Sequence, residues 1–94
     1  MDSISASESS SKNFPNHLDL GKNFGDAYLT KREAEVLRCV VLGYSAKRTA
    51  KFLNISYRTV ESYIDIIKLK LRCSTKREII EIVILSEIFH LLGL

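Results

Sequence analysis

SYRTVESYIDIIKLKL, residues 56–71, carries its apolar side chains at the spacing of an amphipathic helix. The apolar positions recur at intervals of four, three and four residues, at Val60, Ile64, Ile67 and Leu71. At about 100° per residue they form one narrow stripe, which predicts a helix with one buried face. The opposite face carries Arg58, Ser62 and Asp65, with Glu61 on its shoulder. That face is either simply solvated or used for recognition, and the rest of the chain must decide.

The first part of the chain differs in composition from the rest. Residues 1–12 contain six serines and almost no large apolar side chains, which predicts disorder because such a segment cannot offset its ordering entropy. Residues 13–29 hold the only proline and two of the four glycines, as a linker does. We therefore expect a disordered tail and linker over residues 1–27 and one folded domain over residues 28–94.

The residues that carry enzymatic or metal chemistry are sparse. Cys39 and Cys73 are too few for a disulfide framework and lack the spacing of metal ligands, so reduced, buried thiols are expected. There is no nucleophile–base pair, Gly-rich phosphate loop or close carboxylate pair. A folded body of about 65 residues also has little volume for a buried pocket. We expect no enzyme, no cofactor, no metal and no small-molecule ligand.

Charge is distributed unevenly along the chain. Residues 30–77 hold twelve Lys and Arg against four acids, whereas residues 1–29 and 78–94 are net acidic. A basic block between acidic ends is typical of a surface that binds a polyanion, although a generic solvated surface gives the same count.

Residues of the types that cap helices precede the four periodic segments: Thr30, Ser45, Ser56, and either Ser74 or Thr75. Glu33 and Glu78 follow the two threonines at the spacing of a capping box. Gly43 is placed to end the first helix, and Asn54 tolerates the left-handed turn before the third. An all-α fold of four helices is predicted, over about 31–42, 46–53, 57–71 and 76–91.

Here the sequence resembles a family. The pieces LTKREAEVL, GYSAKRTAKFLNIS, RTVESYI and KLKL, in this order and with these gaps, are similar to the LuxR/GerE-type DNA-binding domain of bacterial transcription factors. The resemblance covers roughly residues 28–83 and implies a four-helix, LuxR/GerE-like helix-turn-helix domain. Its third helix, about 57–71, would enter the major groove of duplex DNA. Arg72 stands where relatives often have Gly, so we expect the turn after this helix to avoid left-handed geometry.

The resemblance also implies which residues contact DNA. The positions that the family uses on bases match Glu61, Ser62 and Asp65. Its phosphate-contacting positions match Lys47, Ser56, Thr59 and Lys70, with Arg58 added as a plausible neighbour. Many relatives carry a base or an amide where this chain has Glu61 and Asp65. Either these carboxylates accept hydrogen bonds from cytosine amino groups, or they pair with nearby basic side chains such as Lys68 or Arg58 and never meet DNA.

The fourth predicted helix is apolar all round, so it must be buried on more than one side. Four of its residues lack an obvious partner inside so small a domain: Ile82, Leu85, Ile88 and Phe89. Since domains of this family commonly pair through their last helix, the resemblance implies a homodimer on an inverted repeat. The alternative is that the helix folds back over Phe14, Leu18 and Phe24 and caps the monomer.

Two other functions stay open: promoter recognition as in sigma factors, and a protein-interaction module that uses the apolar C-terminal helix. The expected partners are double-stranded DNA and a second copy, with RNA polymerase a further candidate and no membrane. The N-terminus lacks the features of a signal peptide, so we expect a cytoplasmic, nucleoid-associated protein. Target sequence, signal, activation or repression, and whether the chain stands alone or is a C-terminal piece are not readable from the sequence.

Overall fold

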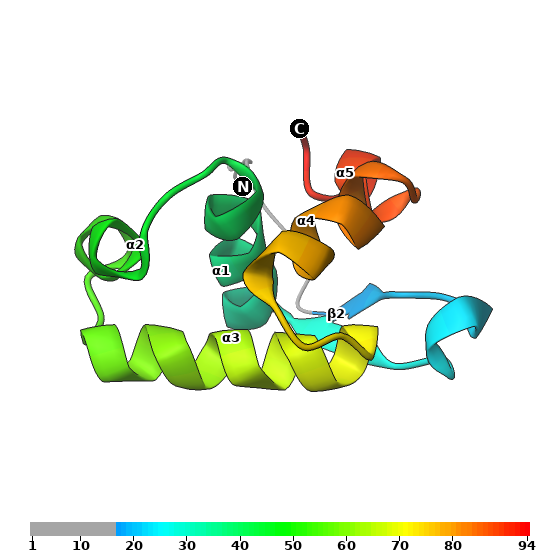
Figure 1. The fold of residues 1–94 in the computed structure, drawn as a ribbon, viewed down its shortest axis with the longest axis horizontal. Coiled ribbons are helices and arrows are strands. Elements are labelled where there is room, and N and C mark those ends of the chain that lie inside the picture. The colour runs from blue at the N-terminus through cyan, green and yellow to red at the C-terminus, as the bar shows by residue number, and fades with distance from the viewer. Residues whose placement is uncertain (1–16) are drawn as a thin grey trace, which may run out of the picture.

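The computed structural model describes residues 17–94, and these form helices that follow the predicted caps (Figure 1). The helices are α1 (Lys31–Val41), α2 (Ala46–Leu53), α3 (Tyr57–Leu71), α4 (Lys76–Ile84) and α5 (Ile88–Leu91). The prediction of a mostly helical helix-turn-helix fold is confirmed. The expectations for residues 1–16, including disorder and any packing of Phe14, lie outside the described residues.

The helix starts are set locally, as predicted. The four capping hydroxyls each accept a hydrogen bond from the backbone three residues later: Thr30, Ser45, Ser56 and Thr75. Glu33 and Glu78 complete the two capping boxes by accepting from the backbone of their cap residues. Backbone hydrogen bonds from Ser74 and Thr75 also hold the pKa of the Glu78 carboxyl below its ordinary value.

A β-hairpin precedes the helices, where the sequence predicted a linker. Strands β2 (His17–Asp19) and β3 (Tyr28–Thr30) pair antiparallel, with Leu18 opposite Leu29, and a 3-10 turn, η1 (Lys22–Phe24), lies between them. Leu18 and Leu29 are buried in the core between exposed neighbours. The expected boundary at residue 27 is therefore corrected, because residues 17–27 belong to the folded body.

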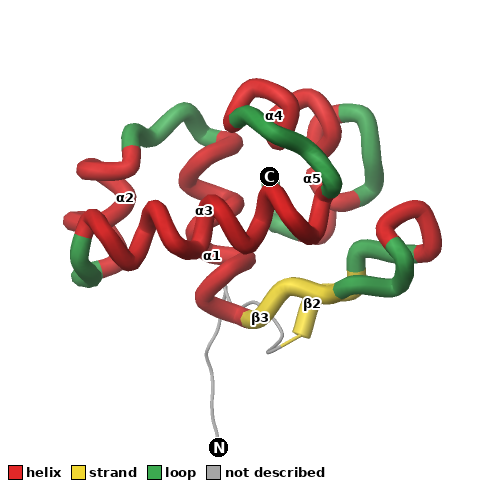
Figure 2. Tube along the Cα trace, turned by 60° about the horizontal axis from the view of Figure 1, so that its bottom comes forward, coloured by secondary structure: helices red, strands yellow, loops and turns green. Residues whose placement is uncertain are grey.

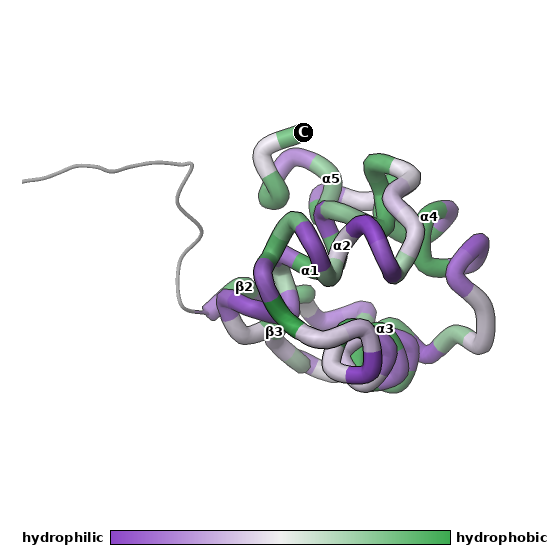
Figure 3. The backbone as a smooth tube through the Cα atoms, turned by 90° about the vertical axis from the view of Figure 1, so that its left-hand side faces the viewer, coloured by the Kyte–Doolittle hydropathy of each residue, from purple (hydrophilic) through white to green (hydrophobic). Residues whose placement is uncertain are grey.

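The core lies where α1, α3, α4 and the hairpin meet. Figure 2 shows α3 crossing α1, and the predicted apolar stripe of α3 is buried along its whole length: Val60, Ile64, Ile67 and Leu71. Val36 and Leu37 of α1 and Ile79 and Val83 of α4 complete the contact, each fully buried. Hydrophilic and hydrophobic residues alternate along α2 and α3 (Figure 3), which leaves one face of each helix free for solvent.

Two turns use left-handed residues. Asn54, between α2 and α3, has φ 56°, as predicted. Arg72, after α3, has φ 59°, so the expectation that this turn avoids left-handed geometry is wrong. The Arg72 guanidinium packs close to the hairpin: a Cβ added at Gly25 would lie 2.8 Å from its Nη2. The glycine at position 25 thus leaves room for the Arg72 side chain.

The apolar segment after residue 75 is not one helix. α4 ends at Ile84, and the chain turns at Leu85–Glu87 before the short helix α5. The Ser86 hydroxyl donates to the Val83 carbonyl and accepts from the Ile88 amide, at 3.2 and 3.3 Å. The turn folds Ile88 and Leu92 into the core cluster that also contains Leu18. The expected helix 76–91 is thus corrected to two helices, and Ile88 has its partners inside the monomer.

Candidate nucleic-acid interface

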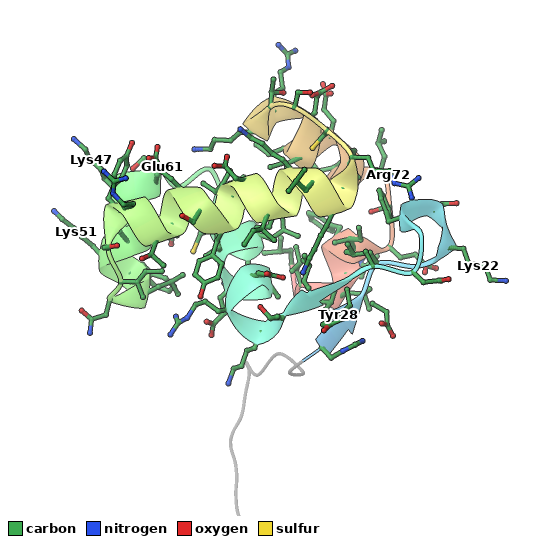
Figure 4. All side chains as sticks on the ribbon, turned by 90° about the horizontal axis from the view of Figure 1, so that it is seen from below. Lys22, Tyr28, Lys47, Lys51, Glu61 and Arg72 are labelled. Carbon is green, nitrogen blue, oxygen red and sulfur yellow. The ribbon has the colours of Figure 1, made fainter. Side chains whose placement is uncertain are left out.

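The polar side of α3 forms an exposed face along the molecule, seen directly in Figure 4. Four polar residues predicted for this face are exposed: Arg58, Glu61, Ser62 and Asp65. Leu69 lies on the same side and is 78% exposed. Since the opposite side of α3 is closed against the core, this face is a ridge that projects from a rigid support. A ridge about one helix wide matches the width of a DNA major groove, about 12 Å.

The start of α2 lies beside the N-terminal half of α3. Lys47, in the first turn of α2, is exposed and lies on the same side of the molecule as Glu61 (Figure 4). In the turn between the helices, the Ser56 and Thr59 hydroxyls are 2.8 Å apart, and Ser56 also accepts from the Thr59 amide. These two residues shape the entry to α3, and Lys47 adds a cation at its flank.

Tyr57 lies one turn before Glu61 on α3. The neighbouring Glu61 carboxylate raises the pKa of the Tyr57 hydroxyl above its ordinary value. The ion pairs formed within residues 17–94 involve neither Glu61 nor Asp65. The alternative in which these carboxylates pair with Lys68 or Arg58 is therefore not what the structure contains.

Lys70 is placed differently from the other predicted contacts. Its Nζ donates to Glu33 Oε1 at 2.7 Å, and the two side chains are only 27% and 8% exposed. The ammonium also lies 5.3 Å from the ring centre of Tyr28 in the hairpin. Through its ion pair with a buried carboxylate, Lys70 joins α3 to α1 and β3, and its contact with a phosphate stays a prediction.

A shallow groove of about 380 Å³ follows the flank of α3 that faces α2 and α4. Its polar lining comes from three helices and their caps: Ser45, Lys47, Tyr57, Glu61, Asp65, Lys68 and Lys76. Lys76 has no predicted role, because its position depends on how the Arg72 turn directs α4. The groove thus joins predicted residues on α2 and α3 to the start of a third helix.

Comparisons with known proteins agree with this geometry. The model of the family described as bacterial regulatory proteins, luxR family, matches residues 27–83. The chain belongs to this family. It is also similar to the transcriptional regulatory protein TdiR of Thauera aromatica, with 51% identity over 47 residues, which is 50% of this chain and 18% of TdiR. No solved structure matches the chain.

In this luxR-family chain, the residues predicted for a dimer interface are spread between surface and core. Leu85 is 86% exposed, whereas Ile82 and Phe89 are partly buried against the core and Ile88 is 2% exposed. The exposed apolar residues in this region are Ile84, Leu85 and Leu91, around the turn from α4 to α5. A surface for pairing would therefore centre on Leu85 and leave Ile88 inside.

The remaining features to consider in this luxR-family chain are its two thiols, possible metal ligands and possible membrane-spanning helices. Burial raises the pKa of the Cys39 and Cys73 thiols, so both stay protonated near neutral pH. Residues 17–94 contain no group of three or more side chains suited to hold a metal ion. None of the helices in that part of the chain has both the length and the hydrophobicity needed to cross a membrane.

Proposed function

We propose that this chain regulates transcription by binding duplex DNA at specific sequences, with α3 in the major groove and α2 across the backbone. The observation that carries the proposal is the exposed polar face of α3, supported by a buried seam and flanked by Lys47, in a luxR-family domain. Glu61, Ser62 and Asp65 read base edges, and the two carboxylates accept hydrogen bonds from cytosine amino groups.

The phosphate contacts come from the first turns of α2 and α3. Lys47 and Arg58 are exposed cations that neutralise phosphates, and Ser56 and Thr59 present hydroxyls at the turn between them. Lys70 contributes indirectly, by fixing α3 against Glu33. These contacts position the domain without sequence preference, so specificity depends on the face of α3.

We further propose a homodimer that forms through the turn between α4 and α5. Leu85 is the most exposed large apolar residue of the described chain, and Ile84 and Leu91 extend the patch beside it. Pairing about a two-fold axis would bury this patch and present two copies of α3 to an inverted repeat. Ile82 and Phe89 border the patch.

Selection of bound sites from random duplexes tests the DNA proposal. The expected result is enrichment of an inverted repeat whose half-sites lie about one helical turn apart. Affinity should fall steeply with salt. Binding to an acidic protein with no affinity for duplex DNA would instead support the protein-interaction module. Enrichment of an asymmetric promoter element would support recognition of the sigma-factor kind.

Sedimentation tests the dimer. The wild-type chain should sediment as a dimer at micromolar concentration, and Leu85→Glu should sediment as a monomer with an unchanged circular dichroism spectrum. Leu42→Glu is the matched control, because Leu42 is also exposed but lies at the end of α1. A wild-type monomer, or a dimer that survives Leu85→Glu, would remove this interface.

The matched segment spans 18% of TdiR, so the wider role of this chain is also a proposal. We propose that the protein is a non-enzymatic regulator located in the cytoplasm, at the nucleoid. Bound at its DNA site, it would influence RNA polymerase at a nearby promoter. The luxR-family match favours this over a sigma-factor role.

A further inference from the structure

Three lysines from three helices line the groove beside α3. Lys47 lies in the first turn of α2, Lys68 in the second half of α3, and Lys76 is the first residue of α4. They are far apart in the sequence and are brought together by the α2–α3 turn and by the left-handed turn at Arg72. Two of them, Lys68 and Lys76, have no role in the fold or the interface described above.

None of these three lysines forms an ion pair in the described part of the chain, and against Glu61 and Asp65 they leave the groove with a net positive charge. The ion pairs within residues 17–94 are formed by other bases, including Arg32, Lys70 and Arg77 at 3.1, 2.7 and 3.6 Å from their carboxylates. Unpaired like charges around one groove raise the electrostatic energy of the free protein, and an incoming anion lowers it. The groove is therefore suited to a negatively charged ligand.

The spacing of the lysines favours a long polyanion over a small one. α3 rises about 1.5 Å per residue, so Lys68 lies about 10 Å further along the helix than Glu61, which neighbours Lys47. Successive phosphates of a DNA strand are about 3.4 Å apart along its axis. A strand that follows the groove presents several phosphates over this length, whereas a small anion presents its charge at one point.

We propose that Lys68 and Lys76, together with Lys47, bind phosphates of one DNA strand along this groove. The inference rests on the proposed function, and it extends the DNA interface from α2 and α3 to the start of α4. Glu61 and Asp65 line the same groove and repel phosphates, so the strand is held at the lysines. Glu61 and Asp65 gain a favourable contact with DNA only where a nucleobase donates a hydrogen bond to them.

The salt dependence of DNA binding tests this assignment. Each phosphate contact contributes about 0.9 to the slope of log K against log salt, so Lys68→Ala and Lys76→Ala should each lower the slope by about one unit. The double variant should lower it by about two units and leave the order of preferred sequences unchanged. Lys68→Arg and Lys76→Arg should restore the slope, because arginine keeps the charge.

Lys22→Ala is the matched control, since Lys22 is an exposed lysine in the hairpin, far from Lys47 (Figure 4). It should leave the slope within a few tenths of a unit. The probe is a short duplex carrying the selected site, followed by fluorescence anisotropy, with thermal melts to establish that each variant is folded.

The outcomes separate this inference from the proposed function. A wild-type chain that binds DNA with a steep slope, together with an unchanged slope in the double variant, overturns the role of Lys68 and Lys76 alone. A wild-type chain with no salt-dependent binding to duplex DNA overturns both. If the double variant loses binding to polyglutamate but keeps the DNA slope, the groove serves an acidic protein and the assignment to DNA is wrong.

Discussion

The ammonium group of Lys70 lies 2.7 Å from Oε1 of Glu33, and the same oxygen accepts a hydrogen bond from the backbone amide of Thr30. One buried carboxylate oxygen therefore joins the end of α3 to the cap of α1. Glu33 is 6% exposed, and its two partners offset the cost of burying its carboxylate. This relationship makes Lys70 a structural residue, in contrast to the free lysines of the groove.

Lys70→Ala should lower the free energy of unfolding by about 1–3 kcal/mol, because it leaves a largely buried carboxylate with one partner fewer. Urea denaturation measures the loss. Arg77→Ala is the control: the Arg77–Glu81 pair is exposed at 3.6 Å, and its removal should cost less than about 0.5 kcal/mol. A Lys70→Ala variant with wild-type stability and a salt slope reduced by one unit would restore the phosphate-binding role.

Leu18→Ala tests whether the hairpin is part of the core. Leu18 is 3% exposed and lies opposite Leu29, so its truncation should cost about 2–4 kcal/mol through lost burial and a residual cavity. Leu85→Ala removes the same atoms from a side chain that is 86% exposed, and should be nearly neutral for the monomer. Equal, small effects on the midpoint of urea denaturation would show that residues 17–27 are dispensable for folding.

Substitutions on the face of α3 should change sequence preference. Glu61→Gln and Ser62→Ala are expected to shift the preferred base at one position of each half-site by about 1–3 kcal/mol. Competition binding with single-base variants of the selected site measures the shift. Lys47→Ala should instead weaken binding to all of these duplexes about equally. Uniform weakening by all three substitutions would mean that this face does not read bases.

The cap of α4 should make stability depend on pH. The folded-state pKa of Glu78 is depressed, so its contribution is present above the unfolded pKa and is lost as pH falls through the folded pKa. The wild-type melting temperature should therefore fall more steeply below about pH 4.5 than that of Glu78→Gln, whose side chain does not titrate. Parallel curves for the two proteins between pH 7 and 3 would contradict the cap as the source.

Local signals were enough to predict where α1, α2, α3 and α4 begin. Thr30, Ser45, Ser56 and Thr75 act on amides only three residues away, so the residues that start each helix are adjacent in the sequence. The stripe on α3 was equally clear because its four apolar positions keep one phase over about three turns. The exposed face of α3 followed directly from that stripe.

The hairpin could not be predicted in the same way. Each strand has three residues with a single buried leucine, too short for an alternating pattern, and a glycine-containing turn separates them. Its stability comes from packing against α1, which is a tertiary effect. The break in the last predicted helix was also missed. Apolar residues lie on every side of this segment, so its sequence shows no helical periodicity whose interruption could mark the turn at Ser86.

The candidate site was predictable where its residues share one helix. The pairing of Lys70 with Glu33 joins positions 37 residues apart, and the approach of Lys76 to Lys68 depends on the backbone at Arg72. Neither follows from spacing along α3. Sequence similarity transfers a residue's position in the family, whereas its ionic partners depend on the rest of this chain.

Thr30 belongs to two elements at once, since it ends β3 opposite His17 and caps α1. Opening the hairpin therefore removes the support of the first turn of α1, and opening that turn releases the Glu33 carboxylate that holds Lys70. Amide hydrogens in these segments should exchange with solvent in a single cooperative step, at similar rates. The C-terminal half of α3 would then loosen together with the hairpin, while its N-terminal half, capped by Ser56, stays protected.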